Sequence, residues 1–205
     1  MTILHFKELP KVIPNNSQVS IDTNVVTPLT HGFHKYPGKF IPQIPEWAIK
    51  NYLSDREQVV LDPFVGSGTT LVESTVFGYD SFGIDIDPLS CLISKVKSTP
   101  LDPAQFLTIS NWIMDSKETV EPNFMPEVEN LTHWFTNDAT IKLSKLRTLI
   151  DEIPLVFKDI ANISDYYDAF VIALSGIIRR VSNADNQSQK TYVSGTKPKK
   201  PAEVY

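Results

Sequence analysis

Residues 59–70 have the sequence VVLDPFVGSGTT and decide the fold, because they join a buried strand to a helix through a glycine turn. The apolar run at the start of this stretch predicts the strand, Val59–Phe64. Gly66 and Gly68 tolerate the dihedral angles of a tight turn and leave room for a ligand against the backbone. The following helix is expected to end at Gly78, and its N-terminus offers unpaired N–H groups and the positive end of a dipole to an anion.

A second strand and another helix repeat this pattern. Ser81–Ile86 predicts the strand, and Asp87 followed by Pro88 predicts the cap and first turn of the helix. A further helix is predicted to open at Pro42, ahead of the first strand. The alternation of strands and helices predicts an α/β fold with parallel strands. Asp85 ends the second strand about twenty residues after the glycine turn, where an acid can bind the diol of a ribose.

Four parts are expected along the chain. Weak periodicity predicts an irregular N-terminal arm with one short strand at Ser20–Val26. The α/β pattern comes next, and beyond Pro100 the sequence changes to helical stripes and then to a polar segment rich in lysine. The expected boundaries are 1–30 for the arm, 31–100 for the ligand-binding α/β part, 101–182 for the helical region and 183–205 for the tail.

The helical region contains the strongest periodicity of the chain. Apolar residues recur at helical spacing over Ile163–Val181, which predicts one long helix with Tyr166 and Phe170 facing a core. Another helix is expected to begin at Pro103, and an apolar stripe before the long helix is expected to end at Pro154.

Composition excludes several classes of protein. The net charge of −5 excludes a surface that is basic throughout, so contacts with nucleic acid must come from a local patch. The single cysteine, Cys91, excludes an internal disulfide and a thiolate metal cage, and its place on a predicted helix suggests a small core residue. His31 and His34 lack a third ligand, so no metal site is expected. With no signal peptide and no long apolar run, we expect a cytoplasmic protein without a membrane segment.

Three blocks of the sequence resemble motifs of S-adenosylmethionine-dependent amino-methyltransferases that act on DNA. Residues 62–70, DPFVGSGTT, resemble motif I, residues 83–88, GIDIDP, resemble motif II, and residues 34–40, HKYPGKF, resemble motif X. A dinucleotide site would have a third glycine where Leu71 stands, and a phosphate loop would have a lysine after its glycines. The resemblance implies a partial Rossmann-like methyltransferase fold, with about two parallel strands and flanking helices followed by the helical region.

The resemblance also implies a site for S-adenosylmethionine. In that family the positions of Asp62 and Gly66–Gly68 hold the amino acid part of the cofactor, the position of Asp85 holds its ribose, and motif X folds over its methionine end. The cofactor-binding residues expected on this basis are Tyr36, Lys39, Phe40, Asp62, Pro63, Phe64, Gly66, Ser67, Gly68, Thr69, Thr70, Asp85 and Ile86.

The catalytic motif of that family has no counterpart among these 205 residues. It is a tetrapeptide with two consecutive prolines, Asp/Asn/Ser-Pro-Pro-Tyr/Phe/Trp, and the chain contains no Pro-Pro pair, so no catalytic residue is assigned. The family's sheet also has more strands than the two predicted here, and an unpaired apolar strand favours aggregation. We therefore expect the cofactor-binding half of a split or truncated enzyme, completed by a second polypeptide or by a missing C-terminal part.

A basic segment near the end of the chain is the candidate for DNA contacts. Between residues 179 and 200 six basic residues face a single acid, Asp185. Contacts to phosphates supply most of the affinity of proteins for DNA, so these side chains are expected to bind the backbone. The six are Arg179, Arg180, Lys190, Lys197, Lys199 and Lys200.

The resemblance implies methylation of an exocyclic amine in DNA, either N4 of cytosine or N6 of adenine, in a restriction-modification setting. Chemistry on a base requires that the base be flipped out of the duplex. Two alternatives stay open. Some RNA guanine methyltransferases carry a similar run to residues 62–69, although the motif X block favours DNA. A catalytically inactive subunit that binds DNA or a partner is also compatible with the missing tetrapeptide.

Overall fold

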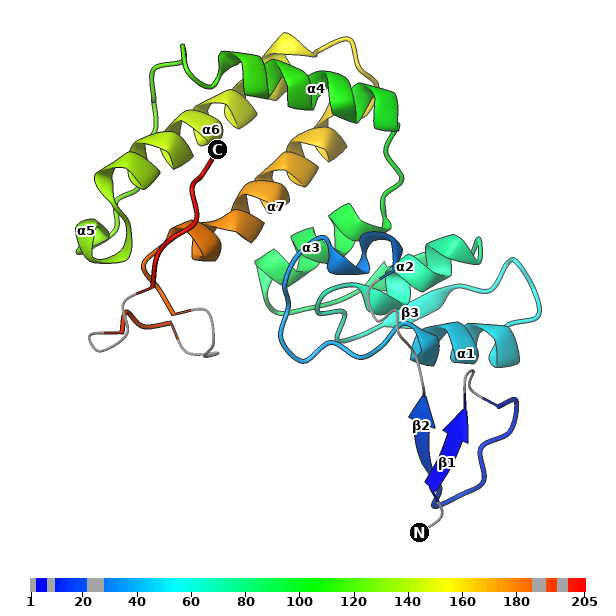
Figure 1. Cartoon of the computed structure of the whole chain (residues 1–205). Helices are drawn as coiled ribbons and strands as arrows, with labels where there is room; N and C mark the ends of the chain where they lie inside the picture. The colour runs from blue at the N-terminus through cyan, green and yellow to red at the C-terminus, as the bar shows by residue number, and fades with distance from the viewer. Residues whose placement is uncertain (1–2, 7–9, 22–27, 186–190, 195–198) are drawn as a thin grey trace. The chain divides into compact units, whose positions relative to one another are not determined.

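The computed structural model describes residues 3–6, 10–21, 28–185, 191–194 and 199–205. The chain divides into two compact units, residues 1–99 and residues 100–205, and each is described by itself. Figure 1 shows strands and helices in the first unit and a group of helices in the second. No helix in the described ranges has the length and apolar character that crossing a membrane requires.

A parallel pair of strands organises the first unit. β3 (Val60–Asp62) pairs with β4 (Ser81–Gly83) in the register Val60↔Ser81, which confirms the predicted strands at shorter lengths. Hydrogen bonds continue past both assigned ends, because the Ile84 amide donates to the Asp62 carbonyl and the Val65 amide donates to the Ile84 carbonyl, both at 2.9 Å. The connection between the strands is α2 (Thr69–Val76), so the predicted strand–turn–helix–strand unit is confirmed.

Two further helices complete the α/β part. α1 (Gln43–Tyr52) precedes β3, and α3 (Pro88–Ser98) follows β4 (Figure 1). The Asp87 carboxylate accepts hydrogen bonds from the amides of Leu89 and Ser90, as the predicted N-cap requires. The hydroxyl of Ser90 also donates to this carboxylate at 2.7 Å, and these hydrogen bonds lower the pKa of Asp87. The sequence prediction of the cap and of Pro88 in the first turn is confirmed.

The N-terminal arm is more regular than predicted. β1 (Ile3–Phe6) pairs in parallel with β2 (Gln18–Ile21), in the register Ile3↔Gln18, as a separate two-stranded sheet. The expected strand at Ser20–Val26 starts too late, and its residues 22–26 lie outside the described residues. The missing prediction of β1 has a physical cause. Parallel strands need a long connection rather than a hairpin turn, so no local turn signal marks their pairing.

Four helices lie in the described part of the second unit. They are α4 (Pro103–Ser116), α5 (Leu131–Trp134), α6 (Asn137–Val156) and α7 (Ile163–Val181). The boundaries of α7 match the predicted helix, and Tyr166 and Phe170 lie in its core as expected. Buried residues from α4, α6 and α7 build this core: Ile109, Ile113, Leu149, Ile150, Ile153, Tyr166 and Phe170.

Two expectations about single residues are wrong. Pro154 does not end α6, which continues to Val156, because a proline in the last turn costs the helix only one backbone hydrogen bond. Cys91 is exposed rather than buried, because its thiol faces the loop after β4, 3.6 Å from the Asp85 carbonyl.

Large apolar side chains around β3 and β4 stay exposed within the first unit. Leu61 and Phe82 are cross-strand neighbours in the register, and 60% and 67% of their surfaces are accessible. Phe64 and Ile86 follow the two strands and are more exposed still, at 86% and 99%. In the described ranges β3 and β4 pair only with each other, so much of this small sheet is uncovered.

Candidate functional site

The carboxyl ends of β3 and β4 place the two acids predicted from the sequence. Asp62 is the last residue of β3, and its carboxylate accepts a hydrogen bond from the Phe64 amide at 3.1 Å. Asp85 lies just beyond β4 and accepts from the Gly66 amide at 2.9 Å and from the Asp87 amide at 3.0 Å. The Asp85 carboxylate thus joins the glycine turn after one strand to the loop after the other. Ligands of open α/β sheets bind at this edge, outside the carboxyl ends of the strands.

The two glycines of the turn are needed for different reasons. Both have positive φ, +47° at Gly66 and +76° at Gly68. A Cβ at Gly66 would lie 3.3 Å from the ring of Tyr36, whereas one at Gly68 would lie 2.7 Å from the Cα of Ser94 on α3. Gly66 therefore permits the motif X segment to lie against the turn, and Gly68 permits α3 to pack against the start of α2.

Tyr36 is brought to the turn, as predicted, but its hydroxyl is used within the protein. It donates to the Ser90 hydroxyl at 3.1 Å, because the Ser90 hydroxyl itself donates to the Asp87 carboxylate. This chain of hydrogen bonds attaches the motif X segment to the N-cap of α3. The ring of Tyr36 lies on Gly66, so the side chain forms one wall of the turn.

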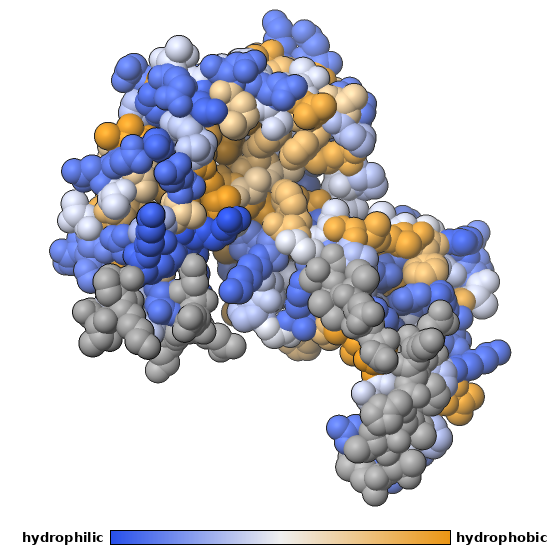
Figure 2. Space-filling view, viewed as in Figure 1, coloured by the Kyte–Doolittle hydropathy of each residue, from blue (hydrophilic) through white to orange (hydrophobic). Residues whose placement is uncertain are grey.

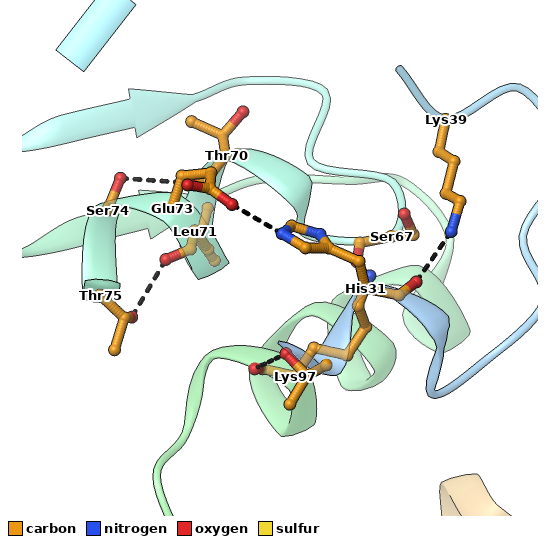
Figure 3. A network of polar contacts seen from close by, with 10 residues as sticks. His31, Lys39, Ser67, Thr70, Leu71, Glu73, Ser74, Thr75 and Lys97 are labelled. Atoms are coloured by element: carbon orange, nitrogen blue, oxygen red, sulfur yellow. Dashed lines mark hydrogen bonds and ion pairs between the residues drawn. The ribbon is translucent and has the colours of Figure 1, made fainter. Parts of the chain in front are cut away.

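A network of buried polar contacts lies behind the glycine turn (Figure 3). His31, in the 3₁₀ turn η1 (Leu29–Gly32), has only 1% of its surface exposed, and its Nε2 lies 2.7 Å from the Glu73 carboxylate on α2. The Lys39 ammonium donates to the His31 carbonyl at 2.8 Å. These contacts tie the segment before and inside motif X to the helix that follows the turn.

Lys97 forms the second half of this network. It lies on α3 with 3% of its surface exposed, and its ammonium donates to the Ser67 carbonyl in the glycine turn at 2.5 Å (Figure 3). Its own carbonyl accepts from the Thr30 hydroxyl of η1 at 2.7 Å. Burial and, to a smaller extent, the charge of Lys39 lower the pKa of Lys97 to about 8.

The structure places the predicted cofactor residues in two groups. Those of the turn and the strand ends lie together, with the side chains of Phe64 and Ile86 exposed beside them. Of the motif X residues, Tyr36 lies against this turn, whereas Lys39 is engaged with the His31 carbonyl and Phe40 is exposed. The buried participants His31, Glu73 and Lys97 were not predicted as functional residues.

The basic residues near the C-terminus differ in their surroundings. The Arg179 guanidinium donates to the Asp185 carbonyl at 2.8 Å, and the Lys199 ammonium donates to the carbonyls of Arg179 and Ser182 at 2.7 Å and 2.9 Å. These two cations satisfy carbonyl groups around the C-terminus of α7. Arg180 and Lys200 are exposed, while Lys190 and Lys197 lie outside the described residues.

An apolar hollow of about 340 Å³ lies within the second unit, where α5, α6 and α7 meet the loop before α5. Figure 2 shows hydrophobic side chains gathered over the region between α6 and α7. The hollow is lined by Phe124, Pro126, Val128, Leu131, Phe135, Thr140, Leu143, Ser144, Arg147, Leu174 and Ile178. Its lining has few polar groups, so it lacks the convergent polar atoms that a catalytic site needs.

Comparison with known proteins agrees with the motifs. The DNA methylase family matches residues 8–96. The type II methyltransferase M.MvaI of Kocuria varians is 31% identical over 196 residues, which cover 89% of this chain and 41% of that protein. The type II methyltransferase M.MjaII of Methanocaldococcus jannaschii is 38% identical over 125 residues, 56% of this chain and 23% of that protein.

A third relative extends the same pattern. The type II methyltransferase M.BsoBI of Geobacillus stearothermophilus is 30% identical over 153 residues, 63% of this chain and 30% of that protein. The chain therefore spans less than half the length of each of these three relatives. No solved structure gives a significant match. These matches show that residues 8–96, which contain the glycine turn after β3 and the acid after β4, are similar to the DNA methylase family.

Proposed function

We propose that this chain binds S-adenosylmethionine at the glycine turn and takes part in methylation of an exocyclic amine of DNA, N4 of cytosine or N6 of adenine, in a restriction-modification setting. The observation that carries the proposal is the Asp85 carboxylate, which orders the turn through the Gly66 amide at 2.9 Å. The family of residues 8–96 and the type II methyltransferases that resemble this chain support the same reaction.

The proposed roles of the residues follow the edge of the sheet. Asp62 and the turn residues Gly66, Ser67 and Gly68 hold the amino acid part of the cofactor, with Thr69 and Thr70 at the N-terminus of α2. Asp85 accepts from the ribose hydroxyls. The exposed apolar side chains of Phe64 and Ile86, beside Pro63, offer surface for the adenine ring.

The motif X residues enclose the methionine end. Tyr36 forms a wall against Gly66, and Lys39 fixes the backbone of the segment through the His31 carbonyl. Phe40 is exposed and offers an apolar surface on the same segment. When bound, S-adenosylmethionine supplies a sulfonium methyl group for transfer, and positioning of the target amine accounts for most of the catalysis.

Completion of the enzyme requires further protein, either more of the same polypeptide or a second one. The exposed side chains of Leu61 and Phe82 on the uncovered strands support this view, since strands with apolar faces are stabilised by covering partners. The chain carries no Pro-Pro pair, so the tetrapeptide that contacts the flipped base has to come from that further protein.

A methylation assay tests this function. The chain is combined with the protein encoded directly downstream, and mixed plasmid DNA, RNA and S-adenosylmethionine carrying a labelled methyl group are supplied. We expect label in DNA as N4-methylcytosine or N6-methyladenine, and none with either component alone. Label found only in RNA would support an RNA guanine methyltransferase, and cofactor binding without any transfer would support an inactive DNA-binding or partner-binding subunit.

The first prediction concerns the ribose site. Asp85→Ala is expected to weaken the binding of S-adenosylmethionine by about 1–3 kcal/mol, because charge-assisted hydrogen bonds to the ribose and to the Gly66 amide are lost. Isothermal titration calorimetry on the full chain measures the affinity. Asp80→Ala, which removes an exposed acid just before β4, is the matched control and should leave the affinity unchanged. Equal affinities of the two variants for S-adenosylmethionine would show that the ribose binds elsewhere.

The second prediction concerns DNA. The six basic residues between 179 and 200 are proposed to contact phosphates, with Arg180 and Lys200 the strongest candidates among the described ones because they are exposed. In the completed enzyme, changing both to glutamine should reduce the slope of log K against log salt by about 1.8, at about 0.9 per phosphate contact. Filter binding over a salt series measures this slope. Changing Lys11 and Lys158 to glutamine removes equal charge from exposed positions and should leave it unaltered.

A further inference from the structure

The peptide bond between Ser67 and Gly68 is held at both of its polar ends. Its carbonyl accepts from the Lys97 ammonium at 2.5 Å, and its amide, on Gly68, donates to the Val65 carbonyl at 2.8 Å. The flanking glycines, with φ of +47° at Gly66 and +76° at Gly68, have the widest choice of backbone conformations. A glycine-rich turn of this kind keeps one conformation only if other groups hold its peptide planes.

Lys97 holds this peptide in an environment that disfavours its charge. Only 3% of its surface is exposed, and among the described residues no carboxylate forms an ion pair with it. The nearby charge of Lys39 repels it further. Burial of an unpaired ammonium destabilises a fold, so a role in overall stability does not account for the lysine.

We propose that Lys97 is a positioning residue for cofactor binding: its buried ammonium fixes the Ser67–Gly68 peptide, so that the backbone of the glycine turn and the N-terminus of α2 keep the conformation that binds the ligand. The proposal rests on the proposed function of the glycine turn. It assigns to Lys97 a contribution to affinity that is made through the backbone, without contact to the cofactor.

Substitution of Lys97 by methionine distinguishes a role in positioning the glycine turn from a role in the stability of the fold. Lys97→Met keeps the unbranched side chain up to the position of Cε and removes the buried charge, so the free energy of unfolding should stay the same or rise. The Ser67 carbonyl, however, loses its donor, and the turn becomes free to change conformation. We expect the dissociation constant for S-adenosylmethionine to rise roughly ten- to hundredfold, the range that corresponds to a hydrogen bond from a charged group.

Isothermal titration calorimetry and thermal unfolding of the full chain test whether Lys97→Met weakens the binding of S-adenosylmethionine without lowering stability. Lys95→Met, which removes an exposed lysine from the same helix, is the matched control and should bind like the unaltered chain. A weaker affinity together with a lower melting temperature in Lys97→Met would indicate a structural role and overturn the proposal. An unchanged affinity would overturn it as well.

Amide hydrogen exchange tests the proposal without any ligand. At a fixed pH, the Gly68 amide should exchange faster in Lys97→Met, because the peptide that carries it is no longer fixed. The Gly78 amide, which donates to Thr75 at 3.0 Å at the other end of α2, is the internal control. If the unaltered chain fails to bind S-adenosylmethionine, the proposed function is wrong, and the Gly68 exchange rate still decides whether Lys97 orders the turn.

A pH series adds a readout that a structural role would not produce. The pKa of Lys97 lies near 8 in the folded chain against an ordinary 10.5, so unfolding takes up a proton between these values and stability should rise with pH there. The bond to Ser67 weakens as the ammonium is lost, so affinity should fall as the pH rises through about 8. The other charged or titratable groups around Lys97 are Lys39, His34 and the His31–Glu73 pair. The charge of Lys97 helps to lower the pKa of His34, so the profiles of the unaltered chain and of Lys97→Met are compared above about pH 7, beyond the range in which a histidine titrates. The difference between the two profiles there reports Lys97, and superimposable profiles would contradict the proposal.

Discussion

Gly68→Ala is expected to lower the free energy of unfolding of the first unit by about 2–5 kcal/mol and to abolish cofactor binding. The φ of Gly68 is +76°, where an L-residue costs about 1–2 kcal/mol. In addition, the new methyl group would lie 2.7 Å from both the Cα and the Cβ of Ser94. Ser94 is buried on α3, so the clash can be relieved only by moving the helix, at about 1–3 kcal/mol.

Gly38→Ala is the matched control, because Gly38 has the same φ of +76° but no atom within 4 Å of the position that the new methyl group would take. It should cost only the backbone contribution, about 1–2 kcal/mol. Urea denaturation followed through the amide signals of α2 and α3 measures both losses. If the two variants were destabilised equally, the packing of α3 against the turn would not be the reason for a glycine at position 68.

The strand–turn–helix–strand unit was predictable because each of its signals is local. The apolar run before Asp62, the two glycines, and Asp87 with Pro88 act through backbone preferences over a few residues. The same holds for α7, whose apolar stripe fixed both of its boundaries correctly. The parallel pairing of β3 and β4 followed from the intervening helix.

The polar network behind the turn was not predictable from the sequence, since its partners are distant along the chain. His31 and Glu73 are separated by 42 residues, and Ser67 and Lys97 by 30. A charged residue on an amphipathic helix is normally assigned to the solvent side, yet Glu73 and Lys97 are both buried. Their positions on the apolar sides of α2 and α3 were the only signal in the sequence.

The composition of the tail, residues 183–205, did not predict which of its cations are engaged within the protein. Its basic residues predict contacts to DNA phosphates, but Lys199 donates to two carbonyls near the end of α7, and Ala184 beside this site is 2% exposed. A helix of 19 residues leaves unpaired carbonyls at its C-terminus, and a cation that returns to them satisfies these groups. Charge alone therefore did not separate the cations that bind the protein's own backbone from those available to DNA.

Glu73→Ala should destabilise the first unit by about 3–5 kcal/mol, because it breaks a buried polar pair and leaves one partner behind. The pair joins His31 and Glu73 at 2.7 Å, with 1% and 5% of the two residues exposed. The Nδ1 of His31 has no hydrogen-bond partner among the described residues, so Glu73 provides the one partner of this ring. Its loss would also release η1 from α2, and with it the segment that carries Tyr36 and Lys39.

Two variants define the origin of this effect. Glu73→Gln retains an acceptor oxygen and should cost only about 1 kcal/mol. Glu46→Ala breaks the exposed pair between Glu46 and Lys50, at 2.5 Å within α1, and should cost about 0.3–0.5 kcal/mol despite the shorter distance. The same urea titration, followed at the amides of α2, gives all three values. Burial rather than distance determines how much each pair contributes, so the loss of free energy of unfolding in Glu73→Ala should exceed the loss in both controls by at least about 2 kcal/mol. A loss as small as that of Glu46→Ala would show that η1 is held to α2 by other contacts.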